Sequence, residues 1–92
     1  MSNMRGKSMK ALAHDIAEGY LTVNPIILKP LDGDSLKGLY EAISRYQIEI
    51  RAGKFPFGDP QAIRMRNLKL QRLFGAIMVI RNFAKSKRII LV

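Results

Sequence analysis

The sequence contains no cysteine and a single histidine, His14. The absence of cysteine excludes a disulfide framework, a thiolate metal site and a cysteine nucleophile. One histidine cannot form the multi-histidine clusters that hold most catalytic zinc ions. Because no acids and bases converge elsewhere in the sequence either, we expect no enzyme, no metal and no cofactor, and we expect His14 to be a surface residue. The redox compartment is therefore undetermined, and a cytoplasmic location is the default expectation.

Long apolar runs are also missing. The longest one, from Leu73 to Ile80, has eight residues and contains Gly75, whereas a transmembrane helix needs about 20. The first fourteen residues carry basic and no acidic side chains, but no apolar segment of the kind found in secretory signals follows them. We therefore expect neither a transmembrane segment nor a secretory signal.

Acidic residues are absent from the last third of the chain. Residues 60–92 contain eight basic and no acidic side chains, whereas residues 1–59 contain eight basic and seven acidic ones. The 92 residues together carry a net charge of +9. A chain of this length fits a single domain spanning residues 1–92. The uneven charge bears on partners rather than on the fold, and it points to the C-terminal segment.

Apolar residues recur at helical spacing in three segments, 9–18, 35–52 and 60–85. Residues suited to helix ends bound these segments: Ser8 and Gly19, then Asp34 or Ser35, then Asp59 with Pro60. Between the first two segments, Asn24, Pro25 and Pro30 leave room for one or two helical turns.

The pattern predicts an all-α fold, a small bundle of three main helices with a short Pro-bounded turn. Segments 35–52 and 60–85 are joined by a short loop and should form an antiparallel hairpin, with segment 9–18 laid across it. Residues 1–7 are expected to be flexible. The tail at residues 86–92 is compatible with a strand, a packed segment or an exposed anchor.

The last helix is unusual in its length and in its apolar surface. About 26 residues would reach roughly 39 Å, so the helix either projects from the domain or bends near Gly75. Its apolar residues form two arcs rather than one, and a helix of this kind is usually packed on two sides. We assign the first arc to the core: Ile63, Leu70, Leu73, Phe74, Ile77, Ile80 and Ala84. The second arc contains Ala76 and four residues that we assign to a partner interface: Met65, Leu68, Val79 and Phe83.

Four basic residues lie in the first half of the same helix: Arg64, Arg66, Lys69 and Arg72. They can be an ordinary solvated face, which keeps a small protein soluble. However, they lie near the positive end of the helix dipole, and no acidic residue within 60–92 compensates them. We therefore expect a nucleic-acid-binding surface for phosphates, supported by the basic N-terminal residues, with salt-sensitive and sequence-independent affinity. RNA, DNA and an acidic protein surface are not distinguished.

Two further interpretations stay open. The second arc on the last helix favours a protein-interaction or self-assembly module, in its simplest form a homodimer, and the basic, apolar end of the chain at 83–92 would suit attachment to a membrane surface.

The segment Phe55-Pro56-Phe57 is expected to plug the core between helices. The alternative is that one of its rings is exposed and stacks on a base or docks a partner.

Overall fold

The computed structural model describes residues 8–91, so the expected flexibility of residues 1–7 concerns a segment outside the described residues. It contains four helices, α1 (Met9–Glu18), α2 (Pro25–Leu28), α3 (Gly33–Ala52) and α4 (Pro60–Ser86). No strand occurs within residues 8–91, and the expected all-α bundle is confirmed. None of these helices is both long and apolar enough to cross a membrane.

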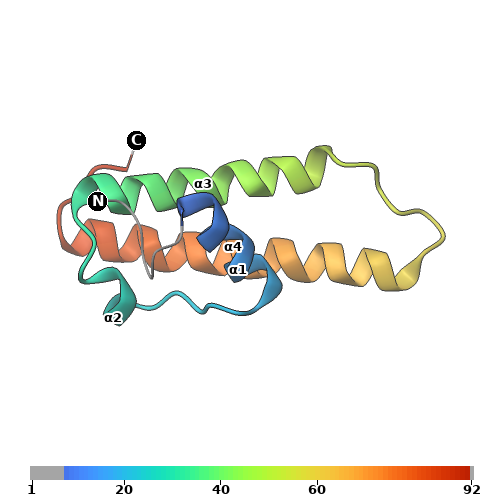
Figure 1. Ribbon diagram of the computed structural model, residues 1–92, viewed down its shortest axis with the longest axis horizontal. Coiled ribbons are helices and arrows are strands. Elements are labelled where there is room, and N and C mark those ends of the chain that lie inside the picture. The colour runs from blue at the N-terminus through green and yellow to red at the C-terminus, as the bar shows by residue number, and fades with distance from the viewer. Residues whose placement is uncertain (1–7, 92) are drawn as a thin grey trace.

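The helices α3 and α4 lie side by side as an antiparallel hairpin, and the short α1 packs against both of them (Figure 1). The single turn of α2 packs against α4. The helix α4 is continuous through Gly75, and the longest dimension of the molecule is 44 Å. Of the two alternatives for this helix, the structure therefore shows projection rather than a bend.

Side-chain caps explain where all four helices begin. Each of four polar side chains accepts a hydrogen bond from the backbone N–H three residues later, which satisfies one donor of the first turn. The pairs are Ser8 with Ala11 at 3.1 Å, Asn24 with Ile27 at 3.1 Å, Asp32 with Ser35 at 2.7 Å, and Asp59 with Ala62 at 3.1 Å. Pro25 and Pro60 follow their caps directly, where a missing N–H costs nothing.

The start of α3 corrects one expectation. The cap is Asp32 rather than Asp34 or Ser35, and the helix begins at Gly33. Asp34 lies in the first turn, where a carboxylate complements the positive end of the helix dipole. Ser35 is buried inside the helix. Asp and Ser both favour the N-cap position, and the chain uses the aspartate that precedes the two expected residues.

The core also differs from the expected arc on α4. Phe74 is 57% exposed, and Ile63 and Leu70 are only half-buried, whereas Ala76 and Phe83 of the second arc are buried. The reason is that α1 and α2 cover α4 on the side of Ala76 and Phe83, so the buried stripe is displaced toward that side. Buried side chains from all four helices and from the α1–α2 connector form one cluster, with Leu12, Leu28, Leu36, Leu39, Ile43, Leu73 and Ile80 fully buried.

The C-terminal residues form a packed tail. The N–H groups of Arg88 and Ile89 donate to the carbonyls of Lys85 and Ala84, at 3.2 and 2.8 Å, which is the hydrogen-bond pattern of a Schellman motif. Arg88 occupies the left-handed position that usually requires glycine, with φ 57°. Beyond it, Ile89 and Leu91 pack against the core.

Candidate functional site

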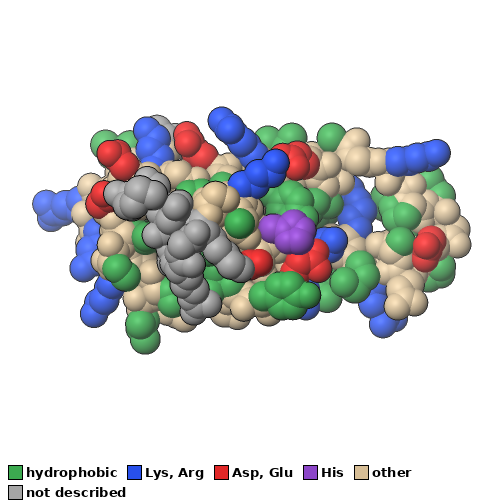
Figure 2. Space-filling model, viewed as in Figure 1, with side chains coloured by type: hydrophobic (Ala, Val, Ile, Leu, Met, Phe, Trp, Pro, Cys, Tyr) green, Lys and Arg blue, Asp and Glu red, His purple; other side chains and the backbone are tan. Residues whose placement is uncertain are grey.

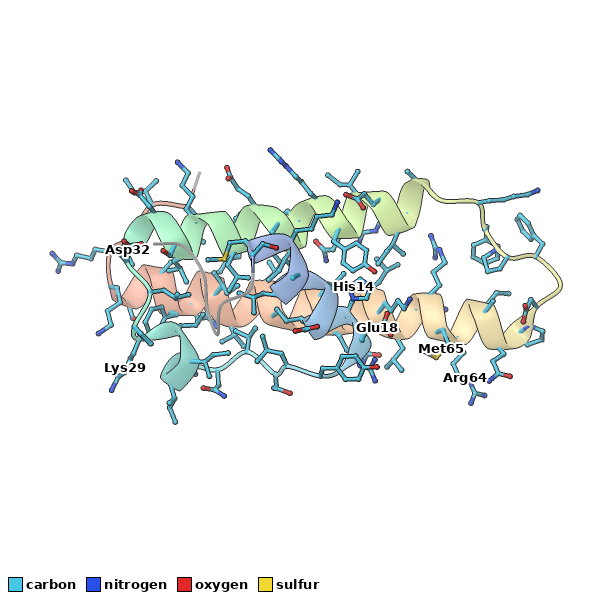
Figure 3. The ribbon with its side chains drawn as sticks, in the orientation of Figure 1. His14, Glu18, Lys29, Asp32, Arg64 and Met65 are labelled. Carbon is cyan, nitrogen blue, oxygen red and sulfur yellow. The ribbon has the colours of Figure 1, made fainter. Side chains whose placement is uncertain are left out.

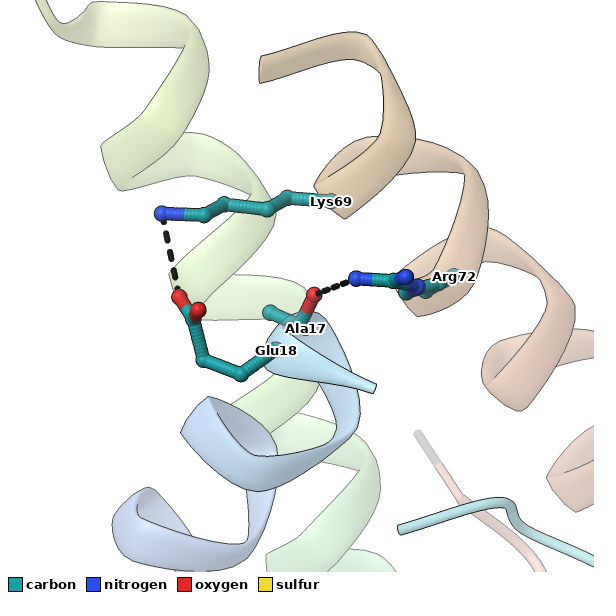
Figure 4. Close-up of polar contacts among 4 residues, drawn as sticks. All are labelled: Ala17, Glu18, Lys69 and Arg72. Atoms are coloured by element: carbon teal, nitrogen blue, oxygen red, sulfur yellow. Dashed lines mark hydrogen bonds and ion pairs between the residues drawn. The ribbon is translucent and has the colours of Figure 1, made fainter. Parts of the chain in front are cut away.

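Two of the four basic residues predicted to bind phosphate hold α1 against α4. Lys69 Nζ lies 3.0 Å from Oε2 of Glu18, and Arg72 Nη1 donates a hydrogen bond to the carbonyl oxygen of Ala17 at 3.0 Å (Figure 4). We call these two contacts the clasp. Ala17 belongs to the last turn of α1, where carbonyls lack an intrahelical partner and the dipole favours a cation. Lys69 and Arg72 are thus unfavourably placed with respect to the dipole of α4 but favourably placed at the C-terminal end of α1.

The clasp also has an electrostatic signature. The hydrogen bond from Lys69 is the main cause that lowers the pKa of Glu18 below its usual value, and the charges of Lys69 and Arg72 act in the same direction. Glu18 is therefore held in its charged form. It supplies the negative charge that is absent from residues 60–92.

Gly19 completes the clasp by leaving room for the guanidinium group. It ends α1 in the left-handed conformation, with φ 85°. A Cβ atom at this position would lie 3.0 Å from Cζ of Arg72, so the guanidinium group would have to shift by a few tenths of an ångström. The left-handed backbone conformation therefore favours glycine, and the absence of a side chain leaves Arg72 room to reach Ala17.

Arg66 is held by a different contact. Its guanidinium carbon lies 5.1 Å from the centroid of the Phe55 ring, within the range of a cation–π interaction. The side chain is half-buried, and its Nε atom is buried with no hydrogen-bond partner among the described residues. Arg66 is thus an anchor for the loop between α3 and α4.

Arg64 is the one exposed side chain of these four basic residues. Figure 3 shows it together with Met65 on the side of α4 that is turned away from α3. The structure therefore does not bring the four predicted residues together as one open basic face. Three of them have contacts inside the chain, and Arg64 remains free to meet a partner.

The residues predicted to form a partner interface also divide into some that the chain covers and some that stay exposed. Phe83 is buried and Val79 packs against the core, so the chain itself covers this end of the arc. Leu68 is half-buried, and Met65 is 40% exposed. The part of the arc that remains open to a partner lies near the start of α4.

The exposed members of the predicted phosphate-binding set and of the predicted partner interface, Arg64 and Met65, lie on one part of the hairpin. No residue from 44 to 72 is buried, because α1 reaches only the base of this segment and the hairpin extends beyond it (Figure 1). We call residues 44–72 the arm. Seven basic and two acidic side chains give it a net charge of +5. The arm is thus a basic two-helix projection with no core of its own.

Three cations are exposed near the end of the arm. Arg51 lies in the last turn of α3, Lys54 in the loop, and Arg64 in the second turn of α4. The antiparallel hairpin places them at the same end of the molecule, where Figure 2 shows hydrophobic and basic side chains together with an acidic one. The sequence contained a signal for Arg51 and Lys54. Both follow Glu49, the last acidic residue of α3, and the loop after α3 contains a single acidic residue, Asp59.

The loop Phe55-Pro56-Phe57 closes the end of the arm instead of plugging the core, which corrects that expectation. The two rings contact each other, with centroids 4.6 Å apart and planes tilted by 55°. Phe55 is half-buried beneath Arg66, whereas Phe57 is 84% exposed. The structure therefore supports the alternative, an exposed ring.

A separate cavity of about 340 Å³ lies between α1 and α3. His14 is exposed, as expected, and its ring stacks on that of Tyr46 at 5.7 Å. Charged residues of both signs are also part of its lining: Lys10, Glu41, Arg45 and Glu49. No group of three or more metal-binding side chains occurs within residues 8–91. This cavity shows no arrangement that singles out one ligand.

Known proteins give no independent indication of what the arm binds. No protein-family model, no curated protein and no solved structure matches this chain. The assignment of a function therefore depends on the charge, exposure and contacts of its own side chains.

Proposed function

We propose that this protein is a non-enzymatic module that binds nucleic acid through its phosphate backbone, and that the arm is its binding surface. The observation that carries the proposal is the combination of a net charge of +5 with the absence of any buried residue from 44 to 72. Cations that are exposed on a projecting hairpin can approach a polyanion without any change in the core. Phosphate neutralisation of this kind gives affinity without sequence readout.

The surface differs from the one expected along the first half of α4. Lys69 and Arg72 are committed to the clasp, so we assign phosphate contacts to Arg51, Lys54 and Arg64 instead. If each neutralises one phosphate, the slope of log K against log salt is about −2.1 for a single strand and about −2.7 for a duplex. The four contacts expected from the sequence, on the first half of α4, would instead give a slope of about −3.6 on a duplex.

The test is a titration of fluorescently labelled single-stranded and duplex DNA and RNA at several salt concentrations. The triple variant Arg51→Gln, Lys54→Gln, Arg64→Gln should bind weakly and with a flatter salt dependence. A matched control, Lys29→Gln, Lys37→Gln, Arg81→Gln, removes the same charge from exposed residues outside the arm. Equal losses in the two triple variants would show that only net charge matters, and no binding by the wild type at low salt would end the proposal.

A second candidate function is self-association through the arm. It is favoured by the exposure of Met65 and Ile48, at 40% and 64%, on a segment with no core. Because a charge of +5 on each arm opposes close approach, such a dimer should tighten as salt rises, opposite to the trend for nucleic acid. Sedimentation equilibrium at low and high salt distinguishes the two: a monomer at about 100 μM under both conditions excludes the dimer at that concentration.

A further inference from the structure

We infer that Phe57 is a base-stacking platform and that the ligand of the arm is single-stranded rather than duplex nucleic acid. The inference rests on the proposed function and adds the class of ligand. Its basis is the place of this ring: it is the most exposed large hydrophobic side chain of the described chain, at 84%, and it belongs to the loop at the end of the hairpin, which follows the exposed Lys54 and precedes the exposed Arg64 in the sequence.

The loop holds the ring in a defined position. The N–H of Phe57 donates to the carbonyl of Phe55 at 2.9 Å, and the N–H of Asp59 donates to that of Pro56 at 3.2 Å. Gly58, with φ 79°, is the residue of this second turn that needs a positive φ. Two successive hydrogen-bonded turns around a proline leave the backbone few alternatives.

A second layer lies beneath the ring. Phe57 contacts Phe55, and Phe55 in turn lies under the guanidinium group of Arg66. The Nε atom of Arg66 is buried without a hydrogen-bond partner among the described residues, and its guanidinium carbon lies over the Phe55 ring. Phe57 thus already contacts a supported ring before any ligand binds, and this contact reduces the conformational entropy that is lost when a base stacks on its exposed surface.

The chemistry of the surroundings selects the ligand. A base in a duplex has both faces covered by its neighbours, so an exposed ring cannot reach one without unstacking it, whereas an unpaired base offers a free face. Cations beside an exposed ring are the combination used by proteins that bind single strands, with phosphates on the cations and bases on the ring. Membrane insertion would require a continuous apolar tip, whereas the same loop carries the charged residues Lys54 and Asp59.

The experiment measures affinity for a labelled oligothymidine and for a duplex of the same length. Phe57→Ala should weaken binding of the single strand by about 5- to 150-fold, while affinity for the duplex changes by less than about twofold. Phe57→Trp should retain single-strand binding, and Phe57→Leu, which keeps apolar bulk without a π face, should lose most of it. Ile48→Ala, which removes another exposed apolar side chain from the arm, is the matched control and should have no effect.

Fluorescence gives a readout that a structural role would not change. A single strand that carries 2-aminopurine should be quenched on binding to the wild type and to Phe57→Trp, but not to Phe57→Leu. Salt-sensitive binding that is equally strong in Phe57→Ala would overturn the inference and leave the proposed function intact, and no binding to any strand would overturn both. If the substitution instead abolishes binding to phosphatidylserine vesicles and leaves that to oligothymidine unchanged, the ring is a membrane contact and the inference is wrong.

Discussion

The clasp predicts that Arg72 and Arg64 have opposite roles although they lie on one helix and have the same charge. Arg72 donates to the Ala17 carbonyl at 3.0 Å across 55 residues of sequence. A hydrogen bond from a charged donor contributes about 1.5–3 kcal/mol. Arg72→Ala should therefore lower the free energy of unfolding by about 1.5–3 kcal/mol, which is a loss of about 10- to 150-fold in the ratio of folded to unfolded protein.

Arg64→Ala should show the reverse behaviour. Its side chain is exposed, so the free energy of unfolding should change by less than about 0.5 kcal/mol, while the salt slope for a single strand should become flatter by about 0.7. Urea unfolding and oligothymidine titration on both variants form the assay, with binding measured far below the unfolding midpoint. Stability unchanged in Arg72→Ala, together with a flatter salt slope, would refute the clasp and restore the basic face predicted from the sequence.

Three further outcomes can be measured by urea unfolding. Because the folded-state pKa of Glu18 lies below its usual value of 4.5, its contribution is present above that pH and is lost as the pH falls through the folded-state pKa. The stability difference between the wild type and Glu18→Gln should thus shrink from pH 7 to pH 3, and a constant difference would contradict the role of Lys69. Asp32→Asn keeps a capping oxygen and should be more stable at pH 7 than Asp32→Ala; equal stabilities would show that the cap contributes nothing. Leu39→Ala, at a fully buried position, should cost about 2–5 kcal/mol, and Ile48→Ala in the arm less than about 0.5 kcal/mol; similar costs would mean that the arm has a core.

The helices were predictable because local chemistry determines their ends. Ser8 and Gly19 bound α1, and Asp59 with Pro60 starts α4, as the sequence indicated. The C-terminal end of α4 gave no such signal, since Arg88 occupies a position where glycine would be expected. A tertiary contact explains it: Ile89, which follows Arg88, packs against the core, and this packing compensates a backbone conformation that an arginine rarely adopts.

The division of the basic residues could not be predicted in the same way. Spacing along one helix shows which side chains share a face, but not what another helix places opposite that face. Glu18 and Lys69 are far apart in sequence and meet only because α1 lies across the hairpin. An acid in the last turn of a helix is unfavourable with respect to the dipole, and Glu18 was therefore the one local sign that a cation from elsewhere would be found beside it.

The same placement separates the basic residues that stabilise the fold from those to which we assign phosphate contacts. Lys69 and Arg72 lie at the base of the arm, where they attach α1, whereas Arg51, Lys54 and Arg64 lie toward its end and have no such task in the fold. A hairpin that extends beyond its core exposes surface without contributing buried area, so stability alone does not favour it. The proposed function gives the extension a physical use, because its exposed cations and the solvent-facing Phe57 ring would bind a charged strand while the core remains unchanged.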